Sequence, residues 1–145
     1  MRTAGLAVLL LSTLLAAGCD PTPSQASRDE IQEQLVGTWL RDYVQDGSRV
    51  RRVLVLQADG RFSESSLAVG PVKAGERHHG EGRWLYDGTN LKRHYRLIDG
   101  KPTAAPTVPF AAFQIEFRGR HEFTGTDHVR RRQLRYQRVA EDTEP

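Results

Sequence analysis

Gly82-Arg-Trp-Leu-Tyr-Asp-Gly-Thr-Asn-Leu-Lys-Arg-His-Tyr-Arg-Leu-Ile-Asp-Gly100 is the most informative stretch of this sequence for its fold. Trp84 and Tyr86 are two residues apart, which places both rings on one face of an extended strand. The dipeptides Asp87-Gly88 and Asp99-Gly100 follow apolar or aromatic residues, and such pairs favour tight hairpin turns because both positions tolerate positive φ. The stretch therefore predicts two antiparallel strands joined by a hairpin.

The same pattern continues on both sides of this stretch, with a third dipeptide at Asp59-Gly60. Residues 101–109 contain three prolines, so we expect a loop or an edge crossing that takes no part in a strand ladder. About eight short strands in direct sequence favour an all-β fold, a small antiparallel up-and-down β-barrel, because closure removes the exposed sheet edges. The expected strands are 37–44, 50–57, 61–69, 78–86, 90–98, 110–118, 121–126 and 129–139.

Alternation along the expected strands indicates one apolar lining. Phe113, Ile115 and Phe117 share a face, and Leu134 and Tyr136 share another. An eight-stranded barrel is just wide enough for its own side chains or one small ligand, so both a filled and a hollow interior remain open. The segment 53–56 is apolar on both faces, which predicts a cover for its outer face: the short helix described next, or another wall.

A short helix is expected at 28–35, ahead of the barrel. Ser27 and Glu30 have the spacing of a capping box, and Ile31 and Leu35 lie on one helical face. A coiled linker is the alternative, and Gly37 would end either. The barrel domain is expected to span 28–140 and to be followed by a disordered tail at 141–145.

The N-terminal residues resemble an export signal. An apolar run at 6–17 follows Arg2 and is shorter than the roughly 20 residues of a spanning helix. It ends in Leu14-Leu-Ala-Ala-Gly-Cys19, which resembles the lipobox of bacterial lipoproteins. The resemblance implies a signal peptide at 1–18, acylation of Cys19 and a tether at 19–27. An ordinary signal with an incidental cysteine is the alternative.

These features predict a lipid-anchored protein of the bacterial cell envelope that faces the periplasm. Asp20 resembles the residue that retains lipoproteins in the inner membrane of enteric bacteria, which favours that membrane. The formal net charge of +3 would suit nucleic acid, but an exported protein rarely meets it, so we expect the membrane, reached through the lipid, as the partner instead.

Four motifs in order resemble the bacterial lipocalin-like lipoproteins. They are Leu35-Val-Gly-Thr-Trp39, Ala58-Asp-Gly-Arg-Phe62, Gly82-Arg-Trp-Leu-Tyr-Asp-Gly88 and Tyr136-Gln-Arg-Val139. The resemblance implies that Trp39 closes one end of the barrel and that Arg138 of the last strand lies across its ring.

Catalytic motifs are not found in the sequence, which contains no Gly-x-Ser-x-Gly, no His-Glu-x-x-His and no phosphate loop. We therefore expect a non-catalytic protein without a cofactor. His78, His79 and Glu81 suggest metal ligands, with His94, His121 or His128 as further donors. Adjacent strand residues face opposite sides, however, so no metal site is expected.

The run His128–Arg138 is the most unusual stretch, and its inward face places Arg132 and Arg138 beside Leu134 and Tyr136. A buried guanidinium needs a partner, which is either a protein carboxylate, with Glu64 and Asp42 as candidates, or a ligand. We expect Arg132, Tyr136 and Trp84 to bind a small apolar or amphipathic anionic ligand.

Three alternatives remain open for this chain. It could be a protein-interaction module, of the inhibitor or immunity type or part of an envelope assembly, acting through loops 71–79 or 101–109. It could be a structural spacer. The outward arginines of 128–138 could instead attract anionic lipid or an acidic protein, or pair with nearby carboxylates.

Overall fold

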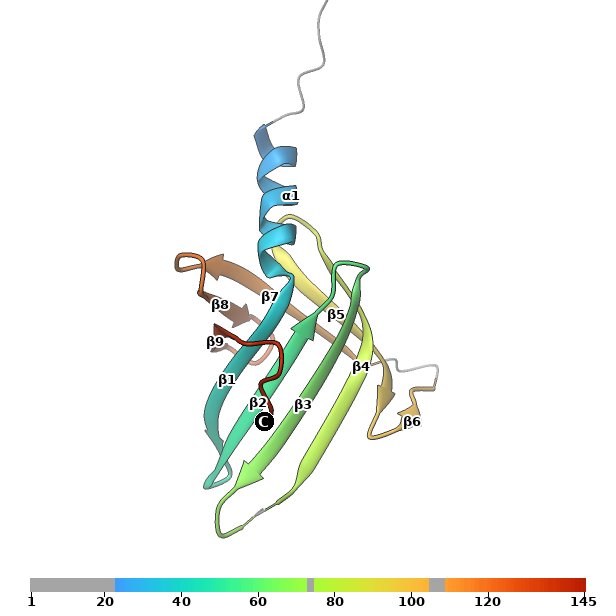
Figure 1. Ribbon diagram of the computed structural model, residues 1–145, viewed down its shortest axis with the longest axis vertical. Helices are drawn as coiled ribbons and strands as arrows, with labels where there is room; N and C mark the ends of the chain where they lie inside the picture. Colours follow the sequence, from blue (N-terminus) through green and yellow to red (C-terminus); the bar gives the residue numbers. More distant parts are fainter. Residues whose placement is uncertain (1–22, 73–74, 105–108) are drawn as a thin grey trace, which may run out of the picture.

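The computed structural model describes residues 23–72, 75–104 and 109–145, and these form one helix and nine strands (Figure 1). The elements are α1 (Pro23–Leu35), β1 (Gly37–Gln45), β2 (Ser48–Leu56), β3 (Arg61–Val69), β4 (Arg77–Tyr86), β5 (Asn90–Ile98), β6 (Lys101–Pro102), β7 (Phe110–Phe117), β8 (Glu122–Asp127) and β9 (Arg132–Val139).

Eight of these strands form a closed antiparallel barrel. They are hydrogen-bonded in the order β4-β3-β2-β1-β9-β8-β7-β5, and β5 pairs again with β4. This is the predicted up-and-down meander, and the fold prediction is confirmed. β6 lies outside the ring as a short hairpin on β5, with Leu97 opposite Pro102. The prediction that 101–109 takes no part in a ladder was wrong at this point, because an edge position tolerates proline.

Two kinds of turn connect the strands. Asp99-Gly100 has positive φ at both residues, as predicted, and so does Asp46-Gly47, a fourth dipeptide that the sequence analysis did not single out. At Asp59-Gly60 and Asp87-Gly88 only the glycine has positive φ. There the aspartate instead accepts backbone hydrogen bonds, for example from Asn90 N to Asp87 Oδ1 at 2.7 Å. These carboxylates fix the turns.

α1 stands on one end of the barrel, which we call the closed end (Figure 1). Leu35 is fully buried and Ile31 packs against the same core, as their shared helical face predicts. The helix begins at Pro23 rather than near Ser27. It is therefore longer than the predicted 28–35 and includes the last residues of the predicted tether.

The closed end is filled with rings and aliphatic side chains. Trp39 meets Phe123 edge-on at 4.7 Å between centroids, and Phe123 stacks on Tyr136 at 4.9 Å. Leu54 and Leu91 are fully buried among them. The sequence left both a filled and a hollow interior possible, and the closed-end half of the barrel is filled.

The C-terminal residues cover the outer face of β2 and β3 (Figure 1). Thr143 and Pro145 are half-buried, and residues 143–145 face Val53 and Val55 across a recess. Val53 is only 4% exposed although it points outward. The sequence predicted the short helix or another wall as the cover of segment 53–56, and this was wrong. The C-terminal residues 143–145 lie there instead, because two outward valines provide them with an apolar surface.

The pairing of β1 with β9 is short. β1 pairs with β2 over nine positions but with β9 over three, Thr38 to Leu40 opposite Gln137 to Val139. All three pairs lie toward the closed end. The two strands are unpaired with each other over 41–45 and 132–136, and we call this stretch the seam.

Candidate functional site

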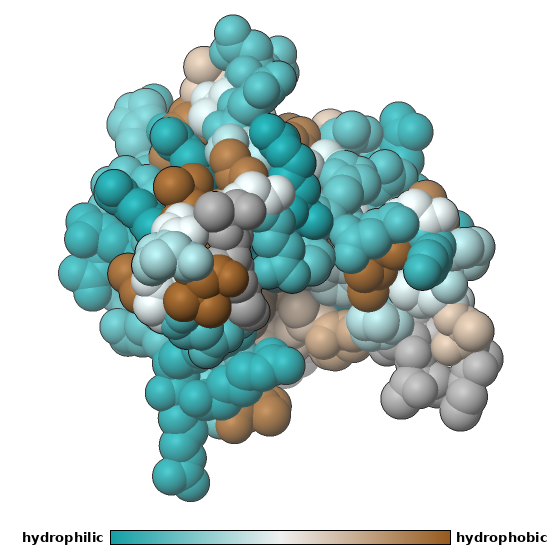
Figure 2. Space-filling model, turned by 90° about the horizontal axis from the view of Figure 1, so that it is seen from below, coloured by the Kyte–Doolittle hydropathy of each residue, from teal (hydrophilic) through white to brown (hydrophobic). Residues whose placement is uncertain are grey.

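The end of the barrel opposite α1, which we call the open end, is formed by the β1–β2, β3–β4, β5–β7 and β8–β9 connections. Figure 2 views the molecule from this side, and the face is mostly hydrophilic with scattered hydrophobic residues. The two loops proposed for protein interaction, 71–79 and 101–109, both belong to it. The structure describes them except for residues 73–74 and 105–108.

Three arginines point into the barrel just inside the open end. Arg41 follows the buried Trp39 by two residues, Arg52 precedes the buried Leu54 by two, and Arg93 follows the buried Leu91 by two. Strand alternation therefore places all three guanidinium groups on the inner face. Arg93 is 2% exposed and Arg41 is 9% exposed, so this is a buried layer of cations.

Glu64 of β3 is the carboxylate among the described residues that pairs with this layer. It accepts a short hydrogen bond from Arg93 Nη1, lies 3.5 Å from Arg52 Nη1, and accepts from the Tyr95 hydroxyl at 3.2 Å. Burial raises the pKa of the Glu64 carboxyl, but the charges of Arg93 and Arg52 outweigh burial and leave the pKa below its usual value. Glu64 is therefore ionised, and both of its carboxylate oxygens have partners.

Arg41 forms no ion pair with any described residue. Its guanidinium carbon lies 4.0 Å from the centroid of the Tyr43 ring, and Arg52 lies over the same ring at 5.5 Å. Burial lowers the pKa of Arg41, and the neighbouring charges of Arg52 and Arg132 lower it further. A buried cation next to other cations favours an anion that neutralises it.

Donors exceed acceptors in this layer. Three guanidinium charges face one carboxylate, which leaves an excess of two positive charges. Arg52 Nε, Arg93 Nε and the Tyr136 hydroxyl are buried without a hydrogen-bond partner. Buried donors are normally satisfied, so these three atoms indicate that an acceptor belongs in the space beside them.

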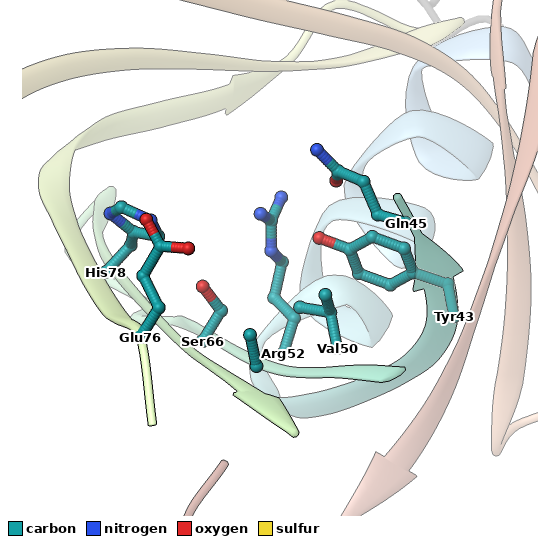
Figure 3. A pocket seen from close by; sticks show the side chains of 8 residues that line it. Tyr43, Gln45, Val50, Arg52, Ser66, Glu76 and His78 are labelled. Carbon is teal, nitrogen blue, oxygen red and sulfur yellow. The ribbon is translucent and has the colours of Figure 1, made fainter. Parts of the chain in front are cut away.

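A recess of about 400 Å³ is lined by Arg41, Arg52 and Arg93, whereas Tyr136 is not part of its lining. Phe110, Ala111 and Phe113 provide an apolar wall on the β7 side. A smaller recess of about 100 Å³ adjoins it, in which Arg52 points between Tyr43 and His78 (Figure 3). The lining residues of the larger recess are Arg41, Tyr43, Gln45, Arg52, Arg93, Tyr95, Pro109, Phe110, Ala111, Phe113, Arg130 and Arg132.

The three predicted ligand-binding residues are separated in the structure. Arg132 lines the large recess, but its side chain is 45% exposed and lies 3.5 Å from Asp127, so its carboxylate partner is neither Glu64 nor Asp42. Tyr136 is buried with a free hydroxyl. Trp84 donates its indole N–H to Gln57 O near the β2–β3 turn, at the closed end. The structure does not bring Trp84 together with the other two.

The closed end has the arrangement that the lipocalin-like resemblance implies. The guanidinium carbon of Arg138 lies 4.3 Å from the centroid of Trp39, within range of a cation–π interaction. Its Nη1 donates to Val36 O at 2.9 Å and its Nη2 donates to Gln34 O. The fully buried Trp39 donates to Leu35 O at 2.8 Å. Together these contacts attach α1 to the barrel.

His78 and His79 pair with carboxylates, and His79 also bonds the Ser65 hydroxyl at 2.9 Å. His78 lies 3.2 Å from both Glu76 and Asp99, and His79 lies 2.8 Å from Glu81. The part of the chain that the structure describes contains no group of three or more side chains arranged to hold a metal ion.

Cys19 and Asp20, and the predicted signal peptide, lie outside the described residues. Within the described ranges, no helix has the length and apolar character that a membrane crossing requires. The acylation of Cys19 stays a prediction.

Arg41, Arg52 and Arg93 were not predicted as site residues. A signal was present in the sequence, because each arginine is two residues away from a leucine or tryptophan that is buried in the barrel: Trp39, Leu54 or Leu91. Strand alternation places such a residue inside regardless of its charge. Comparison adds no further guide, since no protein-family model matches the chain and a search of curated proteins finds no significant match.

Proposed function

We propose that this protein is a lipid-anchored, non-catalytic binding protein of the bacterial envelope that holds a small organic anion in the open end of its barrel. The observation that carries the proposal is the surplus of buried donors: Arg41 without a carboxylate, and unpartnered donor atoms on Arg52, Arg93 and Tyr136. A carboxylate or phosphate group supplies the missing acceptors and the missing negative charge.

The shape of the interior limits the rest of the ligand. The closed end is occupied by Trp39, Phe123 and their neighbours, so a long acyl chain has no path through the barrel axis. The apolar surface next to the cations is the wall of Phe110, Ala111 and Phe113. A ligand with one anionic group and a short apolar part fits both surfaces.

The anchor is proposed from the sequence, and the fold is compatible with it. α1 leads away from the closed end and begins at Pro23 (Figure 1), four residues after Cys19. An acyl chain on Cys19 would thus place the membrane on the side of the closed end. The open end would face the periplasm, where a water-soluble anion reaches it directly.

Titration calorimetry with octanoate and with octyl phosphate tests the anion site. Arg41→Gln and Tyr136→Phe are expected to weaken binding by about tenfold or more, because a hydrogen bond to a charged group contributes roughly 1.5–3 kcal/mol. Arg135→Gln is the matched control, since Arg135 faces outward on β9 and pairs with Glu122 at 2.6 Å. Failure of both anions to bind the wild-type protein, or equal binding by Arg41→Gln, contradicts the proposal.

A protein-interaction module is the second candidate function, and the distribution of exposed apolar side chains favours it. Val129 at 92%, Val44 at 74% and Val72 at 68% exposure lie on or next to three different connections of the open end. Such residues at one end of a barrel mark a contact surface.

A further inference from the structure

The seam between β1 and β9 presents two unpaired strand edges. β1 has a partner on both sides only over Thr38–Leu40, and residues 41–45 pair with β2 alone. On the other side of the seam, residues 132–136 of β9 pair with β8 alone. Among the described residues, no turn or loop provides these edges with backbone hydrogen bonds.

The turn geometry shows which backbone groups face the seam. Asp46-Gly47 forms a two-residue turn, so the pair Gln45 and Ser48 closes it by hydrogen bonds. The backbone groups of β1 alternate in direction. Those of Asp42 and Val44 therefore point away from β2 and into the seam, and both residues are exposed.

Natural edges are protected by proline, by bulges, by charged side chains or by a covering segment. The β1 edge has no proline and no bulge, and its inward charge is the cation Arg41, which repels a basic strand but not an acidic one. The edge also has Val44, which is 74% exposed, and β1 pairs with β2 in unbroken register.

The charges beside the seam determine which kind of strand can bind there. Arg41 of β1, Arg130 of the β8–β9 turn and Arg132 of β9 line the recess behind it. Asp127 is the carboxylate close to the last two, at 3.4 and 3.5 Å. A second copy of this chain would bring the same arginines against each other, whereas an acidic strand would neutralise Arg41.

We propose that the seam binds an extended acidic segment of a partner protein by strand addition. The segment pairs with the backbone of Asp42 and Val44 and directs a carboxylate side chain inward to Arg41. Backbone pairing supplies affinity and the inward side chains supply specificity. This inference rests on the proposed anion site, since the same guanidinium receives the carboxylate.

The peptide acetyl-Val-Glu-Val-Glu-Val-amide is the probe, measured against octanoate on the whole mature chain. At saturating peptide, the hydrogen-exchange rates of the Asp42 and Val44 amides, measured by NMR, are expected to fall by about tenfold or more. Octanoate is expected to leave them unchanged. Two N-methylated versions of the peptide serve as controls. One is methylated at the first set of alternate residues and the other at the second set, so both have the same side chains. At least one version is expected to bind about tenfold more weakly, because methylation removes the paired N–H groups.

Val44→Pro separates the two proposals. It removes one seam N–H and leaves Arg41 and the β1–β2 ladder in place, and an edge position accepts proline. Peptide binding is expected to fall about tenfold while octanoate binding persists. Peptide binding without amide protection, or equal binding of both methylated versions, overturns strand addition. If octanoate binds and the peptide does not, only this inference fails; if neither binds, both proposals fail.

Discussion

The two ends of the barrel satisfy their polar groups in different ways. At the closed end Trp39 and Trp84 donate to carbonyls at 2.8 and 2.9 Å, and Arg138 donates to the carbonyls that end α1. At the open end the buried Nε atoms of Arg52 and Arg93 have no acceptor, and the buried Tyr136 hydroxyl has none either. Near Trp39 at the closed end, the Thr38 hydroxyl is also buried without a partner. The closed end thus leaves a neutral hydroxyl unpaired, whereas the open end leaves cationic donors unpaired.

The exposed apolar side chains show the same difference. Leu85 is the one large hydrophobic residue of the described part that is exposed toward the closed end. The others lie on or next to the connections of the open end. They are Val44, Val69, Val72, Ile98, Phe110 and Val129. Selection for stability alone would not concentrate such residues at one end, which points to contacts made there.

The largest difference between the ends is expected from truncating their side chains. Trp39→Ala is predicted to lower the free energy of unfolding by about 3–5 kcal/mol, because it leaves a cavity among Leu35, Phe117 and Phe123. Val44→Ala at the open end is predicted to change it by less than about 0.5 kcal/mol. Urea denaturation measures both, and Trp39→Phe serves if Trp39→Ala does not fold. Comparable losses at Trp39 and Val44 would remove the distinction between the ends.

The stability of the open end is expected to depend on the charge of Glu64. Glu64→Gln is predicted to cost about 3–5 kcal/mol, because it leaves the buried Arg93 without a counter-charge. The double variant Glu64→Gln, Arg93→Met removes both charges and is predicted to recover most of that loss in urea denaturation. A double variant as unstable as the single one would show that packing, not charge, makes Glu64 important.

The same carboxylate predicts a pH dependence. The folded pKa of Glu64 lies below its usual value of 4.5, so its contribution is complete above the unfolded pKa and is lost as pH falls through the folded pKa. Wild-type stability is predicted to fall more steeply below pH 4.5 than that of Glu64→Gln. Parallel curves for the two proteins in acid would show that other carboxylates carry the acid sensitivity.

The sequence predicted the barrel well because strand alternation and turns are local signals. The eight expected strands match β1–β5 and β7–β9, and the apolar lining was identified from residues such as Phe113 and Leu134. Tertiary contacts decided the rest. Residues 143–145 face Val53 and Val55, and no local pattern specifies that pairing.

The candidate site was only partly predictable. Arg132 and Tyr136 were predicted to face inward, and Arg132 lines the recess while Tyr136 is buried. Arg132 pairs with Asp127, however, across a β8–β9 register that the sequence does not reveal. Arg41 and Arg93 were missed because positive charge suggested an outward direction. The buried position of Arg93 depends on Glu64, the carboxylate that β3 brings to it.

Replacing Arg138 at the closed end is expected to lower the free energy of unfolding by less than replacing Trp39. Arg138→Met keeps the side-chain stem but removes the guanidinium over Trp39 and its hydrogen bonds to Val36 and Gln34. The expected loss is about 1–2 kcal/mol, from the cation–π contact and the hydrogen bonds together. Arg118→Met, on the β7–β8 connection, is the matched control with a change below about 0.5 kcal/mol. Equal effects of the two substitutions in urea denaturation would contradict a closing role for Arg138.

The smallest effect on stability is expected at Arg41, where the effect on binding is large. Removing this buried charge relieves an unfavourable environment, shown by the lowered pKa of Arg41, so Arg41→Gln is predicted to change the unfolding free energy by no more than about 0.5 kcal/mol in either direction. The same variant is predicted to lose about tenfold in octanoate affinity. A residue that costs nothing to remove but is needed for the ligand is retained for binding. A loss of several kcal/mol with unchanged affinity would instead assign Arg41 to the scaffold, and the open end would then differ from the closed end only in its packing.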